Sequence, residues 1–447
     1  MRAGTQAAAL ILATLLASCA SSHAPALVAA RPVASPASVG GPVPSSPAAE
    51  IEPAGAPDPT LAILPAPAAE DVPAAAEIPA PAEIPAVTSR RDDFSRYLSA
   101  LSEASCPAGR AREAPEKIGF SAKAVSLQNL NPSRRQVGEL TFVAGFHLTS
   151  PDKRFGGLSG IDLLDNGNLL AVSDQGDFVW IDLAEDGMRP VAARIAAMRD
   201  VSGNPLRGKA DGDSEGLAVN GGTALVSYER NHRVLAYDLG RCGAAARGAP
   251  IVFGGHGEPL SEAFGDARIR ADANQGAEAL AVTRDWQLFT GVETKLGDQS
   301  PLSARPIEAR PEFNLRIGKG APEFVGLDVL ETGADRRDVR AFSLHRSFSP
   351  LAGNAIAILE TDFHRVQDQS GMPRRVASEI DERSHDRFEA GRTRKLAELG
   401  ILLNIDNFEG IAAKELPDGR VRLYVISDDN FSPSQRTLLF VFEMPKR

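Results

Sequence analysis

Five segments of the chain share one pattern: a short acidic or small-residue element opens an apolar strand, and an acidic residue closes the strand that follows. An internal repeat constrains the fold more than any single motif, because every copy must build the same supersecondary unit. The copies run from Ser159 to Asp174, Glu215 to Glu229, Glu278 to Glu293, Asp338 to Glu360, and Glu409 to Asp428 and Asp429.

Turn residues lie midway in most copies, as in Asp165-Asn166-Gly167 and Pro417-Asp418-Gly419. Between β-rich runs such residues indicate hairpins, in which the start of the first strand lies beside the end of the second. Five hairpins arranged radially would bring their acidic ends to one mouth of a central channel. The sequence therefore predicts an all-β fold, a β-propeller of five to six blades. Alternatively, single carboxylates cap turns or pair with cations such as Arg233.

The chain divides by composition into four parts. Residues 1–19 have a basic start, a short apolar core and Leu16-Ala17-Ser18-Cys19, which resembles a lipoprotein signal with Cys19 as the lipidated residue; an ordinary cleaved signal is the alternative. Residues 20–90 are rich in Ala and Pro and predict a disordered tether. Residues 91–114 predict a short helix (92–103) and a connector, and residues 115–447 the propeller.

Within the propeller region, residues 386–399 show helical spacing and predict a helical interruption. The segment 119–148 is expected to supply an outer strand that closes the ring against the C-terminal unit. Apart from Cys19, the cysteines are Cys106 and Cys242, an even pair that is able to form a disulfide in an exported protein.

Charge and motifs exclude several functions. The net charge of −10 argues against nucleic acid as a partner and suits cation binding. An EF-hand-like run of acids begins at Asp211, but its twelfth position is Gly222 rather than glutamate. Ser159 stands in G-L-S-G-I, which breaks the G-x-S-x-G nucleophile motif, and no H-E-x-x-H or phosphate-binding glycine loop occurs.

Several motifs together resemble the phytase-like domain family, also described as "esterase-like activity of phytase". They are GGLSGIDLL at 156–164, D-x-E-G at Asp213, Asp406-Asn407-Phe408-Glu409-Gly410, and Ser427-Asp428-Asp429-Asn430-Phe431. The resemblance covers roughly residues 115–447. It implies a β-propeller in an exported bacterial protein and, by the family's name, hydrolysis of esters or phosphoesters.

Hard oxygen ligands favour Ca²⁺, which would neutralise a small anionic substrate and polarise its phosphoryl or acyl oxygen. Glu409 and Asp428 are the candidate catalytic residues, with a metal-free carboxylate as general base. Arg230, Lys295 and Arg436 are candidates to hold an anionic leaving group, or surface ion-pair partners. The candidate metal ligands are Asp174, Glu215, Glu229, Glu278, Glu293, Glu360, Glu409, Asp428 and Asp429.

The sequence thus predicts an exported, lipid-anchored Ca²⁺-dependent hydrolase of phosphoesters or small esters, facing the periplasm or the exterior of a bacterial envelope. The lipid on Cys19 would attach it to the membrane. Two alternatives remain: a non-catalytic envelope binding or scaffold propeller, because a fold does not imply activity, and a lactonase-like enzyme.

Overall fold

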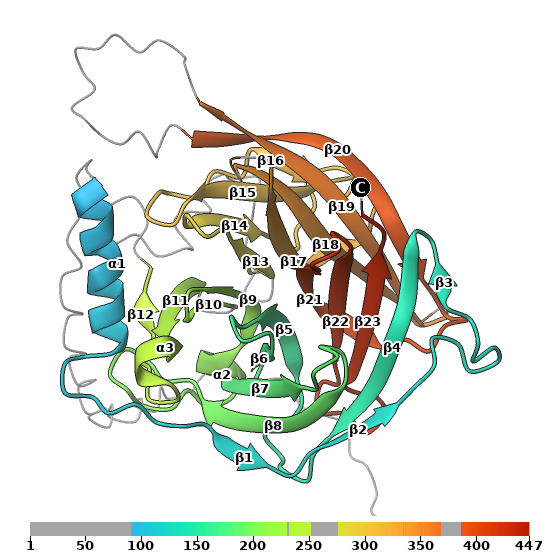
Figure 1. Cartoon of the computed structure of the whole chain (residues 1–447), viewed down its shortest axis with the longest axis horizontal. Helices are drawn as coiled ribbons and strands as arrows, with labels where there is room; N and C mark the ends of the chain where they lie inside the picture. Colours follow the sequence, from blue (N-terminus) through green and yellow to red (C-terminus); the bar gives the residue numbers. More distant parts are fainter. Residues whose placement is uncertain are drawn as a thin grey trace, which may run out of the picture. The chain divides into compact units, whose positions relative to one another are not determined.

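The computed structural model describes residues 91–229, 232–251, 276–333, 335, 337–351, 353–367 and 386–446. The predicted signal with Cys19, the predicted tether at 20–90 and Arg230 lie outside these residues. The described strands form five antiparallel sheets, which surround a central channel as the blades of a β-propeller (Figure 1). The predicted all-β propeller of five to six blades is confirmed, with five blades.

The first three blades follow one another along the chain, and apart from one early strand at the outer edge of blade one, each begins with its innermost strand. Blade one contains β5 (Leu158–Leu163), β6 (Leu169–Ser173), β7 (Asp177–Leu183), β8 (Pro190–Ala197) and, at its outer edge, β1 (Glu116–Ile118). Blade two contains β9 (Ser214–Asn220), β10 (Thr223–Tyr228), β11 (Arg233–Asp238) and β12 (Ala249–Pro250). Blade three contains β13 (Ala279–Val282), β14 (Gln287–Gly291), β15 (Ser300–Pro306) and β16 (Leu315–Ile317).

The last two blades have the longest strands. Blade four contains β17 (Glu323–Thr332), β18 (Asp338–Ser349), β19 (Gly353–Gln367) and β20 (Asp386–Leu399). Blade five contains β21 (Asn407–Glu415), β22 (Val421–Asp428), β23 (Leu438–Met444), β4 (Leu140–Thr149), β2 (Ser121–Ala124) and β3 (Gln136–Val137). Helices α1 (Arg91–Ser105), α2 (Lys209–Gly212) and α3 (Leu239–Cys242) complete the described elements.

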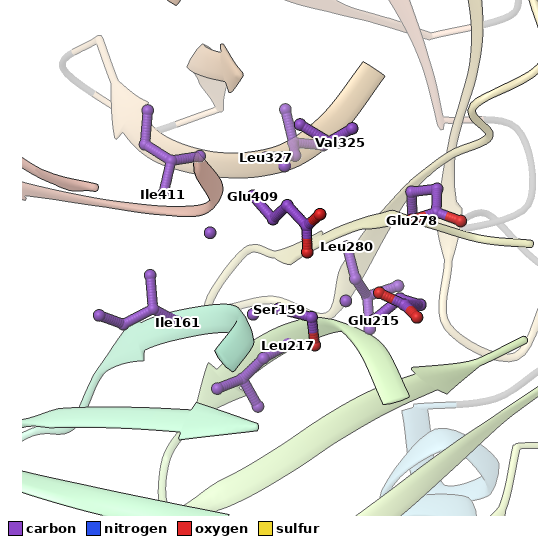
Figure 2. A pocket seen from close by; sticks show the side chains of 14 residues that line it. Ser159, Ile161, Glu215, Leu217, Glu278, Leu280, Val325, Leu327, Glu409 and Ile411 are labelled. Atoms are coloured by element: carbon purple, nitrogen blue, oxygen red, sulfur yellow. The ribbon is translucent and has the colours of Figure 1, made fainter. Parts of the chain in front are cut away.

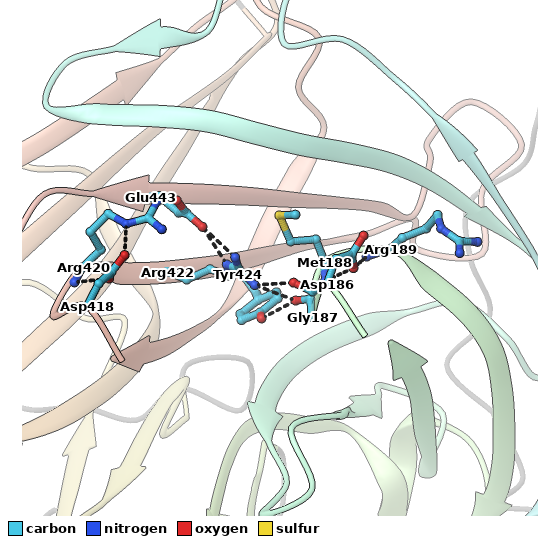
Figure 3. Close-up of polar contacts among 9 residues, drawn as sticks. All are labelled: Asp186, Gly187, Met188, Arg189, Asp418, Arg420, Arg422, Tyr424 and Glu443. Atoms are coloured by element: carbon cyan, nitrogen blue, oxygen red, sulfur yellow. Dashed lines mark hydrogen bonds and ion pairs between the residues drawn. The ribbon is translucent and has the colours of Figure 1, made fainter. Parts of the chain in front are cut away.

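Blade five joins the two ends of the propeller region. Strand β4 pairs with β23 and places Gly145 opposite Phe440, which confirms the predicted outer strand from residues 119–148. At the seam with blade one, the Arg422 guanidinium donates to the carbonyl oxygens of Asp186 and Gly187, and the Tyr424 hydroxyl donates to that of Gly187 (Figure 3). Backbone pairing and these side-chain contacts close the ring.

The core consists of apolar layers between neighbouring blades. Ile161 and Val179 of blade one pack with Leu439 of blade five in one such cluster, and Phe342 of blade four packs with Phe408 of blade five in another. Both faces of most blades are therefore covered. This explains why inner strands such as β22, buried along its whole length, are almost continuously apolar rather than alternating.

Helix α1 confirms the helix predicted at 92–103, and it packs Tyr97 and Leu101 against the layer between blades two and three. Directly after it, Cys106 forms a disulfide with Cys242, with an S–S distance of 2.01 Å. No helix among the described residues has the length and apolar character to cross a membrane.

Two predictions about blade four are wrong. Residues 386–399 form strand β20 rather than a helix, because pairing with β19 buries Leu396 and Leu399 and overrides a helical propensity that is only a weak prior. Asp338 begins β18, the second strand of the blade, whereas the innermost strand begins at Glu323.

Candidate functional site

The five innermost strands carry the same short motif at the same level of the channel. It reads Ser159-Gly160-Ile161 in blade one, and in blades two to five Glu215-Gly216-Leu217, Glu278-Ala279-Leu280, Val325-Gly326-Leu327 and Glu409-Gly410-Ile411. All five copies line one narrow central pocket (Figure 2). Glu215, Glu278 and Glu409, which the sequence predicted to converge, therefore meet around the channel axis.

The glycines allow this convergence because neighbouring inner strands approach closely at their level. A Cβ atom on Gly326 would lie 2.3 Å from the carbonyl oxygen of Glu409, and one on Gly410 would lie 3.1 Å from the amide nitrogen of Ile161. Beyond them, the apolar side chains of the motif, including Leu217 and Leu327, line the pocket. The carboxylates and these apolar side chains thus line the same pocket.

A second set of acidic residues comes from the ends of the second strands. Asp428 pairs with Asn407, and the amide nitrogens of Asp174 and Glu229 donate to the carbonyl oxygens of Gly157 and Asp213 at 2.9 Å. In each of these three hairpins, the acidic residue at the end of the second strand therefore lies beside the first strand, next to the residue two positions before the motif. We call the following set the carboxylate ring: Asp174, Asp213, Glu215, Glu229, Glu278, Glu293, Glu409 and Asp428.

The carboxylates of the ring repel one another. Burial raises the pKa of Glu215 well above its usual value, and the charges of Glu409 and Glu229 add to the shift. Burial raises the pKa of Glu278 in the same way, with Glu215 as the next cause. Burial also raises the pKa of Glu409 to about 7. Burial and the charge of Glu409 together raise the pKa of Asp428 to about 8. Full ionisation therefore requires additional positive charge.

Asp213, Glu215 and Glu229 form the tightest group in the ring: one carboxylate oxygen from each lies within 4.8 Å of the others. Several carboxylate oxygens at this spacing are the donors that Ca²⁺ prefers. The residues present thus fit a calcium ion. Asp213 belongs to the rejected EF-hand run and to the D-x-E-G motif of the sequence, but it is not among the predicted metal ligands.

Two cations of the described part of the chain reach the ring. The Lys209 ammonium lies 2.7 Å from Asp174 and 3.9 Å from Asp213. The Arg346 guanidinium lies 3.3 Å from Glu409 and donates to the side-chain oxygen of Asn407 at 2.8 Å. Sequence reasoning missed Arg346 because the fourth repeat was aligned on Asp338. The segment FVGLD at 324–328, similar to LSGID at 158–162, would have given the correct alignment.

Glu360 does not join the ring. It lies buried in the middle of β19, the third strand of blade four, where Arg340 and Arg394 bind its two carboxylate oxygens. The proposed metal-ligand role of Glu360 is therefore wrong: an outer strand of the blade cannot reach the channel.

Asp429 borders the ring but already has partners. Its carboxylate accepts hydrogen bonds from the amide of Gly157 and the hydroxyl of Thr437, which fix the junction of blades one and five. The two described anion-binding candidates are also engaged: Lys295 donates to the carbonyl oxygen of Ala321, and Arg436 pairs with Asp406 at 3.1 Å.

A five-bladed propeller with a carboxylate ring at one mouth is the class of protein that the fold and site define. Residues 153–431, more than half of the chain, match the model of the family described as "Phytase-like: Esterase-like activity of phytase", and the chain belongs to this family. A search of the curated proteins finds no match.

Among solved structures, the chain is similar to the holo form of the pyranose dehydrogenase PQQ domain from Coprinopsis cinerea, with 8% identity, TM-score 0.34, and coverage of 75% of this chain and 99% of that one. It is also similar to Myxococcus xanthus glutaminyl cyclase, with 11% identity, TM-score 0.32, and coverage of 69% and 97%.

Proposed function

We propose that this phytase-like propeller is a calcium-dependent hydrolase of phosphoesters or small esters that acts at the carboxylate ring. The observation that carries the proposal is the convergence of Glu215, Glu278 and Glu409 from three separate blades on one channel mouth. Burying such a set costs folding free energy unless a cation compensates it. The family's description as esterase-like supports ester chemistry.

Asp213, Glu215 and Glu229 would hold the cation, because their oxygens lie closest together. A bound Ca²⁺ would neutralise an anionic substrate and polarise its phosphoryl or acyl oxygen. Glu278 shares a hydrogen bond with Glu229. It would thereby keep the Glu229 carboxylate oriented towards the cation.

Asp428 is the proposed general base. Its pKa of about 8 lies near neutral pH, where a carboxylate both accepts a proton readily and releases it again. In the reaction, a water molecule adds to the phosphorus or acyl carbon, Asp428 takes its proton, and the bond to the alcohol oxygen breaks. The leaving alcohol oxygen then receives from Asp428 the proton that was taken from the water. Glu409, held by the Asn407 amide at 2.8 Å and by Arg346, would orient the water.

The test is a hydrolysis assay of the full chain with p-nitrophenyl phosphate and p-nitrophenyl acetate, with and without Ca²⁺. The double substitution Glu409→Ala and Asp428→Ala should lower kcat by about 1000-fold or more, because base and orienting group are removed together. Glu415→Ala, at the exposed far end of the same strand as Glu409, is the matched control and should keep full activity. Full activity of the double variant after chelation contradicts the proposal.

The alternative functions predict different outcomes in the same assay. Binding of Ca²⁺ and a small anion without turnover of any substrate would favour a binding propeller. Turnover confined to a lactone, such as a sugar-acid lactone added to the panel, would favour a lactonase-like enzyme.

We also propose that the chain is exported and anchored through lipid on Cys19. The disulfide between Cys106 and Cys242 supports export, because disulfides persist in oxidising compartments. Metabolic labelling of the expressed full chain with a tagged fatty acid should mark the wild type but not Cys19→Ala, which should leave the membrane fraction. A labelled Cys19→Ala variant would overturn the anchor at this position.

A further inference from the structure

Blade four departs from the other blades at both of its ring positions. Its inner motif has Val325 where three other blades have glutamate. Its second strand places Arg346 opposite Glu323, as the second strand of blade five places Asp428 opposite Asn407. Arg346 thus occupies the position that carboxylates hold in the other four blades.

Arg346 lies towards the carboxylates of the two neighbouring blades. It contacts Glu409 and Asn407 of blade five. Burial raises the pKa of Glu409 and of Glu293, which follows the second strand of blade three, and the charge of Arg346 partly offsets both shifts. The cation is therefore part of the mouth rather than of the outer surface of blade four.

Its contacts with Glu409 and Asn407 leave Arg346 with unused hydrogen-bonding capacity. A guanidinium offers five N–H donors, and these contacts engage its two terminal nitrogens. Its Nε atom is buried and has no hydrogen-bond partner among the described residues. Lys209, the other ring cation, already lies 2.7 Å from its carboxylate partner Asp174. Of these two cations, Arg346 is the one suited to bind a further group.

The chemistry of that group follows from the guanidinium. Its planar fork of donors matches the paired oxygens of a phosphoryl group, and such charge-assisted contacts are about twice as strong as neutral ones. A neutral carboxylic ester or a lactone presents no such charge. We propose that Arg346 binds the anionic phosphoryl oxygens of the substrate, so that the ring accepts phosphate monoesters in preference to neutral esters and lactones. This inference rests on the proposed function, since it assigns the substrate class of the same site.

The test is isothermal titration calorimetry of the Ca²⁺-loaded full chain with inorganic phosphate. Arg346→Gln should weaken phosphate binding by about 10- to 100-fold, the value of a hydrogen bond to a charged group. Arg346→Lys should restore part of the phosphate affinity, because lysine supplies the positive charge but not the planar set of guanidinium donors. Arg305→Gln, on the third strand of blade three and 3.3 Å from its own partner Glu312, is the control and should bind phosphate as the wild type does.

Calcium titration of the same variants separates a ligand-binding role from a structural one. Arg346→Gln should bind Ca²⁺ at least as tightly as the wild type, because a competing positive charge is lost. Loss of Ca²⁺ binding in both Arg346 variants would make Arg346 a structural residue and overturn the inference. Equal phosphate affinity of Arg346→Gln and wild type, or no phosphate binding by the wild type, would also overturn it.

A hydrolysis assay then distinguishes this inference from the proposed function. The ratio of kcat/KM for p-nitrophenyl phosphate to that for p-nitrophenyl acetate should fall by about 10- to 100-fold in Arg346→Gln, mainly through KM for the phosphate ester. If neither ester is turned over while the phosphate affinities behave as expected, the hydrolase proposal fails and the assignment of Arg346 stands. An unchanged ratio contradicts the assignment.

Discussion

The two ends of the inner strands both hold buried or half-buried carboxyls, yet these carboxyls have different partners. At the far end of the channel, Asp162 accepts hydrogen bonds from the amides of Leu163 and Val219, and Asp328 accepts from those of Val329 and Ala413. At the carboxylate ring, the carboxylate of Glu215 receives no hydrogen bond from the described residues. The charged groups that shift its pKa most are other acids, Glu409 and Glu229 first.

The far-end pair joins blades to one another. Val219 belongs to blade two and Ala413 to blade five, so Asp162 connects blades one and two, and Asp328 connects blades four and five. Burial raises the pKa of Asp162 well above its usual value and that of Asp328 to about 7. A raised pKa therefore occurs at both ends. An acidic neighbour also occurs at the far end, since the charge of Asp328 adds to the raised pKa of Asp162. The two backbone amides that each far-end carboxyl accepts are what mark it as structural.

The largest expected effect concerns the ring. Glu215→Gln should weaken Ca²⁺ binding by about 100-fold, because it removes one charged ligand of a small set. It should also reduce the loss of stability of the metal-free protein as pH rises, since one carboxyl that would otherwise ionise among like charges is removed. Calcium titration and thermal unfolding of the full chain measure both effects. An unchanged Ca²⁺ affinity of this variant would show that the cation binds elsewhere. The two ends of the inner strands would then not differ in function.

The pH dependence of stability gives the next effect. Because the folded-state pKa values of Glu409 (about 7) and Asp428 (about 8) lie above those of an unfolded chain, the folded state binds more protons between about pH 4 and 8. The stability that these two carboxyls contribute to the metal-free protein should thus be full below about pH 4 and be lost as pH rises through 8, with a decrease in melting temperature of roughly 5 °C or more.

Ca²⁺ should reverse this decrease at pH 8 and have little effect at pH 5, because binding requires deprotonated carboxylates. Differential scanning calorimetry at both pH values, with EDTA or excess Ca²⁺, measures the change. A melting temperature that rises with pH in EDTA would show that the ring carboxyls are ionised without a cation.

The smallest expected effect concerns the far end. Asp328→Ala should lower the free energy of unfolding by about 1–3 kcal/mol, because two backbone amides lose their acceptor. Its Ca²⁺ affinity should equal that of the wild type. Urea unfolding and calcium titration check the two statements. A weakened Ca²⁺ site in this variant would mean that the two ends act as one unit.

Much of the fold was predictable because hairpins are local. Turn residues such as Asp165-Asn166-Gly167 lie within a few residues of the strands they join, so the repeat revealed four of the five inner hairpins and the acidic end of each. Blade four was misaligned because Val325 replaces the expected glutamate. Strand β20 was mistaken for a helix because its pairing partner β19, rather than its own composition, determines its conformation.

The sequence by itself determined that acidic residues recur at one end of successive hairpins, and hence that a propeller would collect negative charge at one mouth. Only the tertiary structure decided which side chains meet there. It excluded Glu360, which lies on an outer strand, and brought Arg346 beside Glu409, 63 positions further along the chain. Closure of the propeller joins segments that are far apart in the sequence. Contacts between blades depend on the order of the strands and on the close approach that glycines allow, and a local sequence pattern encodes neither.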